Sequence, residues 1–179
     1  IDVASVGDTI LVASGIYFEN VNFNGKNIVL QSINGALETI LKPLDSSNPV
    51  IRIDNYENSS TVINGFTIKD GGNLRGSAIH TYSSSPRIEN CIIANCNNTF
   101  DSTNGALSTF HSSPIVKNCL FYGNYTAIHF DSQGSSPTPS IINCTIINNL
   151  SHGLDGLATD NAPQISNSII YDNGRNIAL

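Results

Sequence analysis

One phrase recurs four times in the second half of the chain and constrains the fold more than any other feature. Each copy joins a small residue and Pro to a short apolar stretch that contains Asn followed by Cys or Ser. The copies occupy 85–93, 113–121, 138–146 and 162–170, and a weaker copy occupies 62–68. Their central residues are Asn90, Asn118, Asn143 and Asn167, spaced by 28, 25 and 24 residues. A repeat of this length indicates a solenoid, in which each unit packs on its neighbours.

Short apolar segments flank the phrases. The segment before each phrase is Ala78-Ile79-His80, Ala106-Leu107-Ser108, Ala127-Ile128-His129 or Gly156-Leu157-Ala158, and an Asn-rich turn follows each phrase. These segments are about 3–5 residues long, rich in Ile and Val, and have no helical stretch between them. A leucine-rich repeat has a similar period, but it needs Leu at several fixed sites and a helical return. The pattern predicts an all-β parallel β-helix of about 7 coils, each of about 25 residues.

The Asn of each phrase suits a ladder that runs along the stacked coils. Asn tolerates the left-handed backbone that a sharp bend requires, and its amide can bond to the Asn of the next coil, about 4.8 Å away. We expect Ile88, Val116, Ile141 and Ile165 to point inward, together with Ile93, Phe121, Ile146 and Ile170. Cys91, Cys119 and Cys144 form a neighbouring ladder, with Ser168 as its fourth rung and Cys96 outside it. We interpret them as buried free thiols, with one disulfide or a metal site as alternatives.

The charge content excludes several classes of function. Only 12% of the residues are charged, the net charge is −6, and the 8 Lys and Arg are scattered, so nothing could neutralise a nucleic-acid backbone. No apolar run approaches the roughly 18 residues that a membrane span needs. A surface of amides and hydroxyls suits an extracellular or cell-surface protein, and any signal peptide would lie outside this sequence. Sequons occur at Asn58, Asn97, Asn124, Asn143 and Asn149, as an Asn-rich chain also produces by chance.

The first half predicts looser coils, with strands at 9–12, 27–32, 39–41, 50–53 and 61–68. Residues 6–20 (VGDTILVASGIYFEN) and 25–31 (GKNIVLQ) resemble the opening of right-handed β-helix proteins of the pectin-lyase-like superfamily. These are secreted bacterial or archaeal proteins of the pectate-lyase-like repeat type. The resemblance covers the whole chain and implies a right-handed helix. It leaves activity open, since this scaffold hosts lyases, hydrolases, adhesins and proteins of no known activity.

We expect one domain over 1–179, with looser coils over 1–75 and regular coils over 76–179. In the resembling family an amphipathic helix caps the first coil, and residues 1–5 could be its last turn. Residues 174–179 match the start of a further coil. Uncapped coils expose backbone groups to any neighbouring edge. These ends indicate either a fragment of a longer solenoid or coils that stack on another copy.

The resemblance implies a carbohydrate groove on the face formed by the first strand of each coil. With Ile79, Leu107, Ile128 and Leu157 inward, alternation points the next residues outward. The carbohydrate-binding candidates are therefore His80, Tyr82, Phe110, His129, Asp131 and Asp160. Asp131 and Asp160, with Asp155 on the preceding turn, could bind Ca²⁺ or serve as a glycosidase acid and nucleophile. The alternative is an exposed polar face with unrelated acids.

No catalytic set is evident, so the catalytic residues are unknown and no cofactor is required. A lyase needs a base and a cation or Arg nearby, but Arg52, Arg75, Arg87 and Arg175 fall at different coil positions. The polygalacturonase-like branch has ordered N-T-D, D-D, G-H-G and R-I-K motifs. Here only Ala158-Thr-Asp160 and Ser151-His-Gly153 resemble them, in the wrong order.

The strand after each Asn predicts an outward apolar stripe over four coils, unless the register at the Asn turn places it in the core. Its main members are Ile92, Leu120, Tyr122, Ile147, Ile169 and Tyr171. Three functions follow from the sequence. The first is a non-catalytic extracellular module for carbohydrate binding, adhesion or assembly. The second is a polysaccharide lyase or glycosidase for an acidic polymer. The third is a filament subunit that self-associates through open ends or the stripe.

Overall fold

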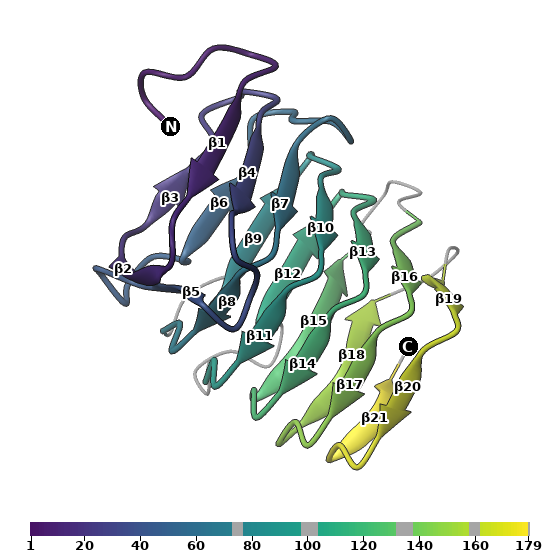
Figure 1. Cartoon of the computed structure of the whole chain (residues 1–179). Helices are drawn as coiled ribbons and strands as arrows, with labels where there is room; N and C mark the ends of the chain where they lie inside the picture. Colours follow the sequence, from purple (N-terminus) through teal and green to yellow (C-terminus); the bar gives the residue numbers. More distant parts are fainter. Residues whose placement is uncertain (73–76, 98–103, 132–137, 158–161, 179) are drawn as a thin grey trace.

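The computed structural model describes residues 1–72, 77–97, 104–131, 138–157 and 162–178. Over these ranges the chain winds into stacked coils, each contributing three short strands that are joined by tight corners (Figure 1). The strands stack on those of the neighbouring coils and form three parallel sheets, here called sheets A, B and C. The predicted all-β parallel β-helix is confirmed, with seven strands in each sheet.

Sheet A contains β1 (Thr9–Val12), β4 (Val29–Ser32), β7 (Val62–Asn64), β10 (Arg87–Glu89), β13 (Ile115–Lys117), β16 (Ser140–Ile142) and β19 (Gln164–Ser166). Sheet B contains β2 (Gly15–Phe18), β5 (Thr39–Lys42), β8 (Thr67–Lys69), β11 (Ile92–Ala94), β14 (Leu120–Tyr122), β17 (Thr145–Ile147) and β20 (Ile169–Tyr171). Sheet C contains β3 (Val21–Asn22), β6 (Ile51–Ile53), β9 (Ile79–Tyr82), β12 (Leu107–Phe110), β15 (Thr126–Asp131), β18 (His152–Leu157) and β21 (Arg175–Ala178).

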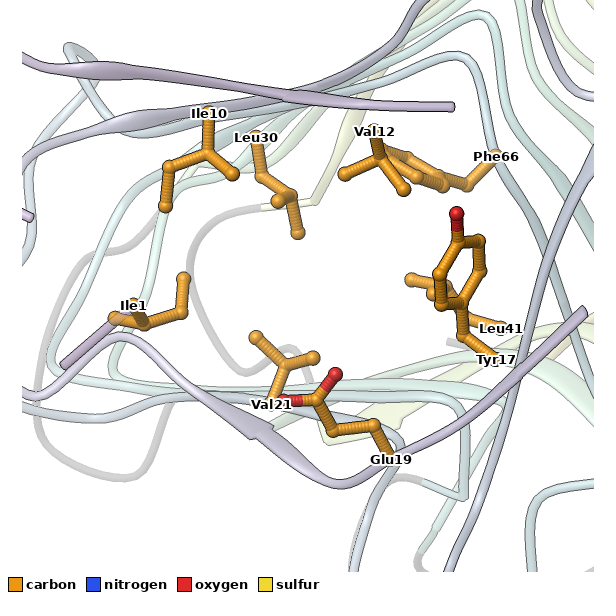
Figure 2. A pocket seen from close by; sticks show the side chains of 9 residues that line it. All are labelled: Ile1, Ile10, Val12, Tyr17, Glu19, Val21, Leu30, Leu41 and Phe66. Atoms are coloured by element: carbon orange, nitrogen blue, oxygen red, sulfur yellow. The ribbon is translucent and has the colours of Figure 1, made fainter. Parts of the chain in front are cut away.

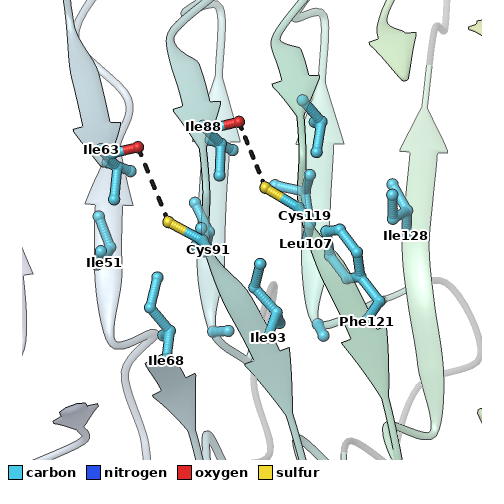
Figure 3. Packing of buried hydrophobic residues seen from close by; sticks show 14 of the residues in the cluster. Ile51, Ile63, Ile68, Ile88, Cys91, Ile93, Leu107, Cys119, Phe121 and Ile128 are labelled. Atoms are coloured by element: carbon cyan, nitrogen blue, oxygen red, sulfur yellow. Dashed lines mark hydrogen bonds between the residues drawn. The ribbon is translucent and has the colours of Figure 1, made fainter. Parts of the chain in front are cut away.

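The core is a set of apolar ladders inside the coils (Figure 3). The predicted inward residues of sheets A and B are buried, except that Ile165 and Ile170 of the last coil are partly exposed because no described coil covers them. On sheet C, Ile79, Leu107 and Ile128 are buried as predicted, and Leu154 takes the place predicted for Leu157. Each fully buried Ile or Leu contributes roughly 1.5–3 kcal/mol relative to its exposed state. The inward ladders of sheets A, B and C are Ile63-Ile88-Val116-Ile141, Ile68-Ile93-Phe121-Ile146 and Ile51-Ile79-Leu107-Ile128-Leu154.

The strands predicted in the first half are present with small changes at their ends. The segment predicted as one strand over 61–68 divides into β7 and β8 at Gly65, whose φ of 78° is a left-handed conformation that favours glycine. β2 and β3 were not predicted, because each is short and follows its neighbour without a strong turn signal.

All three corners of the coil use one device, a left-handed residue followed by an inward residue. At the A–B corner the left-handed residues are Asn90, Asn118, Asn143 and Asn167, with φ of 54°, 54°, 53° and 49°. At the B–C corner they are Asn95, Gly123, Asn148 and Asp172, and at the C–A corner Tyr56, Ser83 and His111. The inward residues that follow are Cys or Ser at A–B, Cys96 and then Asn at B–C, and Glu57, Ser84 and Ser112 at C–A.

The predicted register of β18 was wrong by three residues. Ile128 pairs with Leu154, not with Leu157, and His129 therefore pairs with Asp155. The prediction assumed that a fixed number of residues separates the strand of sheet C from the phrase that follows it, here the phrase at 162–170. The connection from sheet C to sheet A differs in length from coil to coil, whereas the later B–C corners are held by inward Asn residues.

Candidate functional site

On the outer face of sheet C, the predicted carbohydrate-binding residues lie in two rows. Tyr82, Phe110 and Asp131 occupy equivalent positions on β9, β12 and β15. The other row runs through His80, Ser108, His129 and Asp155 on β9, β12, β15 and β18. The grouping of His80, Tyr82, Phe110, His129 and Asp131 therefore agrees with the prediction. The predicted place of Asp160 in the row was wrong, because Leu157 pairs with Asp131, and Asp160 itself lies outside the described residues.

The two histidines are much less exposed than the predicted polar face implied. His80 is 6% exposed and His129 is 2% exposed. Phe110 lies between them, with its ring centroid 5.4 Å from that of His80 and 6.1 Å from that of His129. The histidines thus support the half-buried Phe110 from both sides instead of presenting free imidazoles to solvent.

Asp155 lies on β18 beside His129, not on a turn as predicted. Its Oδ2 atom is 3.4 Å from Nδ1 of His129, so the two form an ion pair when the imidazole is protonated. A carboxylate in this position fixes the orientation of the imidazole ring. The pair was not foreseen because the wrong register of β18 placed Ala158 beside His129.

The expected calcium site is not assembled by the described residues. Asp155 is engaged with His129, and among the residues that the structure describes no group of three or more His, Cys, Asp or Glu could hold a metal ion. Because Asp160 lies outside these residues, calcium binding by Asp131, Asp155 and Asp160 stays a prediction.

Tyr82 is the most exposed aromatic side chain of this face, with 46% of its surface accessible. Its ring meets that of His111 edge to face, with centroids 5.6 Å apart. Tyr82 can offer one ring face and a phenolic hydroxyl to a ligand, while His111 holds the ring in place. Tyr82, Phe110 and Asp131 together form a row with apolar and acidic parts, referred to below as the sheet C row.

Of the candidate Arg residues and catalytic motifs that the structure describes, Arg52 alone lies beside this row, in register with His80 on the neighbouring strand of sheet C. Arg52 pairs with Asp54 at 3.2 Å, and Arg87 pairs with Glu89 at 3.2 Å on sheet A. Ser151 and His152 lie 2.8 Å apart, Oγ to Nδ1, at the start of β18. Arg75 and the Ala158-Thr-Asp160 segment lie outside the described residues.

The predicted Asn ladder is present at the A–B corner, and its side chains are exposed. It is called the outer ladder below. Nδ2 of Asn90, Asn118 and Asn143 donates to Oδ1 of the preceding Asn at 2.8, 3.1 and 3.3 Å, with Asn64 as the first acceptor. Beside this ladder lies an open groove of about 640 Å³. The groove contacts Asn90, Asn118, Asn143, Ile92, Leu120 and Thr145.

A second ladder, buried at the B–C corner, was missed by the sequence analysis and is called the inner ladder below. Asn124 is fully buried and donates through Nδ2 to Oδ1 of Asn149 at 2.9 Å. Asn149 donates in turn to Oδ1 of Asn173 at 2.8 Å. Cys96 stands at the head of this ladder, where its backbone N–H donates to Oδ1 of Asn124 at 3.0 Å.

All four cysteines are buried free thiols, as expected. Cys91 and Cys119 donate to the carbonyl oxygens of Ile63 and Ile88 in the preceding coil, at 3.8 and 3.5 Å (Figure 3). Ser168 continues the row, and its Oγ accepts the backbone N–H of Cys144 at 3.0 Å. Burial raises the pKa of Cys119 well above its usual range. It raises the pKa of Cys96 to about 12.

The predicted apolar stripe points outward, so the alternative register at the Asn turn is not realised. Ile92, Leu120 and Ile147 are half-buried, and Tyr122, Ile169 and Tyr171 are exposed. Self-association through this stripe, or through the coil ends, stays a prediction. The described residues include no helix long and apolar enough to cross a membrane.

In two of the five sequons the side-chain amide of the Asn is buried. Asn124 and Asn149 are 0% and 2% exposed, and their Nδ2 atoms are engaged in the inner ladder. Asn58 and Asn143 are exposed, and Asn143 belongs to the outer ladder. Glycosylation of Asn124 or Asn149 is incompatible with this fold.

The first coil contains a small apolar cavity of about 160 Å³ (Figure 2). Its wall is made of Ile1, Ile10, Val12, Val21, Leu30 and Leu41, with Tyr17, Glu19 and Phe66. The Tyr17 hydroxyl donates to the carbonyl of Ala13 at 3.0 Å. This cavity lies inside the first coils, whereas the sheet C row lies on an outer face.

These features define a right-handed parallel β-helix with an aromatic and acidic row on one outer face. The chain belongs to the family of right-handed β-helix regions, whose pattern matches residues 50–179. No curated protein sequence matches it.

Two solved structures of pectin methylesterase from Aspergillus niger resemble the chain. One is the deglycosylated form, with 13% identity, a TM-score of 0.47, and coverage of 93% of this chain and 69% of that chain. The other keeps an N-acetylglucosamine stub, with 13% identity, a TM-score of 0.46, and coverage of 97% and 79%. Similarity at this level carries no argument about activity.

Proposed function

We propose that the protein is a non-catalytic carbohydrate-binding module that works outside the cell or at its surface. The observation that carries this proposal is the sheet C row, in which Tyr82, Phe110 and Asp131 occupy one position on three consecutive strands. The rungs are about 4.8 Å apart, so the row presents an apolar ring, a second ring and a carboxylate along a line. A polysaccharide chain likewise presents apolar ring faces and hydroxyl groups along a line.

Each residue of the row has a separate part in binding. The exposed ring of Tyr82 stacks on the apolar face of a sugar, and His111 limits its movement. Phe110 extends the apolar surface and is held by His80 and His129. Asp131 accepts hydrogen bonds from sugar hydroxyls, as a carboxylate does more strongly than a neutral oxygen.

A polysaccharide lyase or hydrolase is the second candidate, and the His129–Asp155 pair is the observation that favours it. An imidazole oriented by a carboxylate can act as a general base. The side chain of His129, however, is only 3% exposed, which supports a role in holding Phe110 rather than in reaching a substrate. An enzyme would release unsaturated products or new reducing ends from a panel of uronate and neutral polymers, and His129→Gln would abolish the release.

Binding to the sheet C row is tested by affinity electrophoresis through gels that contain soluble polysaccharides. At least one polymer is expected to retard the protein, and Tyr82→Ala should weaken that binding by about tenfold through loss of ring stacking. Tyr122→Ala is the matched control, because Tyr122 is 39% exposed but lies on sheet B. Equal retardation of the parent and Tyr82→Ala by every polymer would overturn the assignment of the row.

A further inference from the structure

The groove beside the outer ladder combines a polar wall with an apolar floor. Its wall is the row of exposed amides of Asn90, Asn118 and Asn143 at the A–B corner. Its floor is formed by the half-buried side chains of Ile92, Leu120 and Thr145, which come from β11, β14 and β17. Ala36 closes it toward the first coils. The groove therefore follows the solenoid axis across several coils.

The amides of this wall keep hydrogen-bonding capacity. A carboxamide has two N–H donors and two acceptor lone pairs. In Asn118 the ladder uses one N–H, donated to Asn90, and one lone pair, which accepts from Asn143. Within the described part of the chain, each central rung therefore offers one donor and one acceptor beyond the ladder. Two rung spacings of about 4.8 Å place three such pairs along about 10 Å.

The groove carries no charge of its own. None of the side chains that line it is ionisable apart from the thiols of Cys91 and Cys119, which are buried. On the sheet A side, Glu89 forms an ion pair with Arg87 at 3.2 Å, and these charged side chains flank the groove without lining it. A charged ligand would lose hydration here without gaining a partner of opposite charge. A neutral ligand would lose less hydration.

We propose that this groove binds a neutral linear polysaccharide, aligned with the solenoid axis. Sugar hydroxyls bond to the spare donor and acceptor of each outer-ladder amide, and the apolar faces of the sugar rings cover Ile92, Leu120 and the methyl group of Thr145. The regular repeat of the ladder matches a polymer of identical units better than a folded protein surface. This site is separate from the sheet C row and does not depend on it.

The test uses the full chain with Tyr82→Ala as the background, so that the sheet C row contributes little. The probes are hydroxyethyl cellulose, mixed-linkage β-glucan and galactomannan in native gels, with polygalacturonate as the charged comparison. We expect at least one neutral polymer to retard the protein more than polygalacturonate does. Leu120→Glu should weaken that binding by about tenfold or more, because it places a charge in the groove.

Tyr122→Glu is the matched control, since Tyr122 lies on the same strand and the same face but does not line the groove. It should leave binding unchanged. Asn118→Gly keeps the left-handed backbone and removes only the amide, and it should weaken binding by about threefold to tenfold. A cooperative denaturation transition with a midpoint close to that of the parent would show that each variant is folded.

Three results would overturn the proposal. One is the absence of retardation by every neutral polymer in the Tyr82→Ala background. Another is an equal loss from Leu120→Glu and Tyr122→Glu. The third is a concentration-dependent dimer that both substitutions dissociate, which would assign the surface to a second copy of the chain. Equal retardation of the parent and Tyr82→Ala, with Leu120→Glu still weakening binding, would overturn only the proposed function of the sheet C row.

Discussion

The A–B and B–C corners share one backbone turn but differ in the residue that points inward. At the A–B corner a left-handed Asn has an exposed amide, and the inward position is Cys or Ser. At the B–C corner the left-handed residue is Asn, Gly or Asp, and the inward residue that follows Gly123 and Asn148 is a second Asn with a buried amide. The same side chain therefore performs two different tasks in successive corners of one coil.

The two ladders differ in the hydrogen-bond partners of their amides. The outer-ladder amides bond mainly to one another, in competition with water, so each bond contributes little net stability. Asn149 of the inner ladder also donates to the carbonyls of Phe121 and Ile147 and accepts the N–H of Asn124. These are backbone groups at a buried corner, where the loss of a hydrogen-bond partner costs more than at an exposed one. The inner ladder stabilises the solenoid, and the outer ladder leaves amide groups available to a ligand.

The largest expected effect comes from Asn149→Ala. It leaves two carbonyls and one N–H without their side-chain partner, so the free energy of unfolding should fall by about 3 kcal/mol or more. Urea denaturation followed by circular dichroism measures this change. Asn143→Ala, in the same coil but on the outer ladder, should cost about 1–2 kcal/mol, chiefly from left-handed backbone strain. A larger loss for Asn143→Ala than for Asn149→Ala would contradict the comparison.

Replacement of Cys96 is expected to have an intermediate effect on stability, and this effect depends on pH. Its thiol occupies the inward position where later coils have Asn, and burial raises its pKa to about 12. Above pH 9 the unfolded chain loses this proton while the folded chain keeps it, so the thiol's contribution to stability declines as pH rises from about 9 to 12. Between pH 8 and pH 10.5, the parent should therefore lose more stability than Cys96→Ala. Parallel pH profiles of the two proteins would show that Cys96 is not responsible.

The smallest effect is expected for Asn118→Gly. Glycine adopts the φ of 54° without strain, so only two exposed amide bonds are lost, and the free energy of unfolding should change by about 0.5 kcal/mol. Asn118→Ala loses the same bonds and adds backbone strain, so it should cost about 1 kcal/mol more. If the two variants were equally stable, the left-handed conformation would not be the reason for Asn at this corner.

The outer ladder was predictable because it depends on local chemistry repeated at a fixed place in each phrase. The inner ladder also corresponds to a regular spacing in the sequence. Asn124, Asn149 and Asn173 each follow an outer-ladder Asn by six residues, and Cys96 follows Asn90 by six. The constant offset reflects the three-residue strand of sheet B that separates the two corners.

The candidate site was less predictable than the ladders. The row of Tyr82, Phe110 and Asp131 was placed correctly, since each residue lies at a constant distance after an inward apolar residue. The partner of His129 was missed, because the connections from sheet C to sheet A differ in length and give no fixed point for counting. The burial of His80 and His129 was missed as well, because it depends on neighbours that are distant in the sequence.

By itself, the sequence determined the repeat, the left-handed Asn at the A–B corners of the regular coils and the inward row of Cys. These features follow from the backbone preferences and side-chain sizes of single residues within one coil. The tertiary structure alone decided that Asp155 stands beside His129, that one Asn ladder is buried and the other exposed, and that a groove borders the exposed one. These features depend on the register between coils, and register is set by the packing of whole coils against one another.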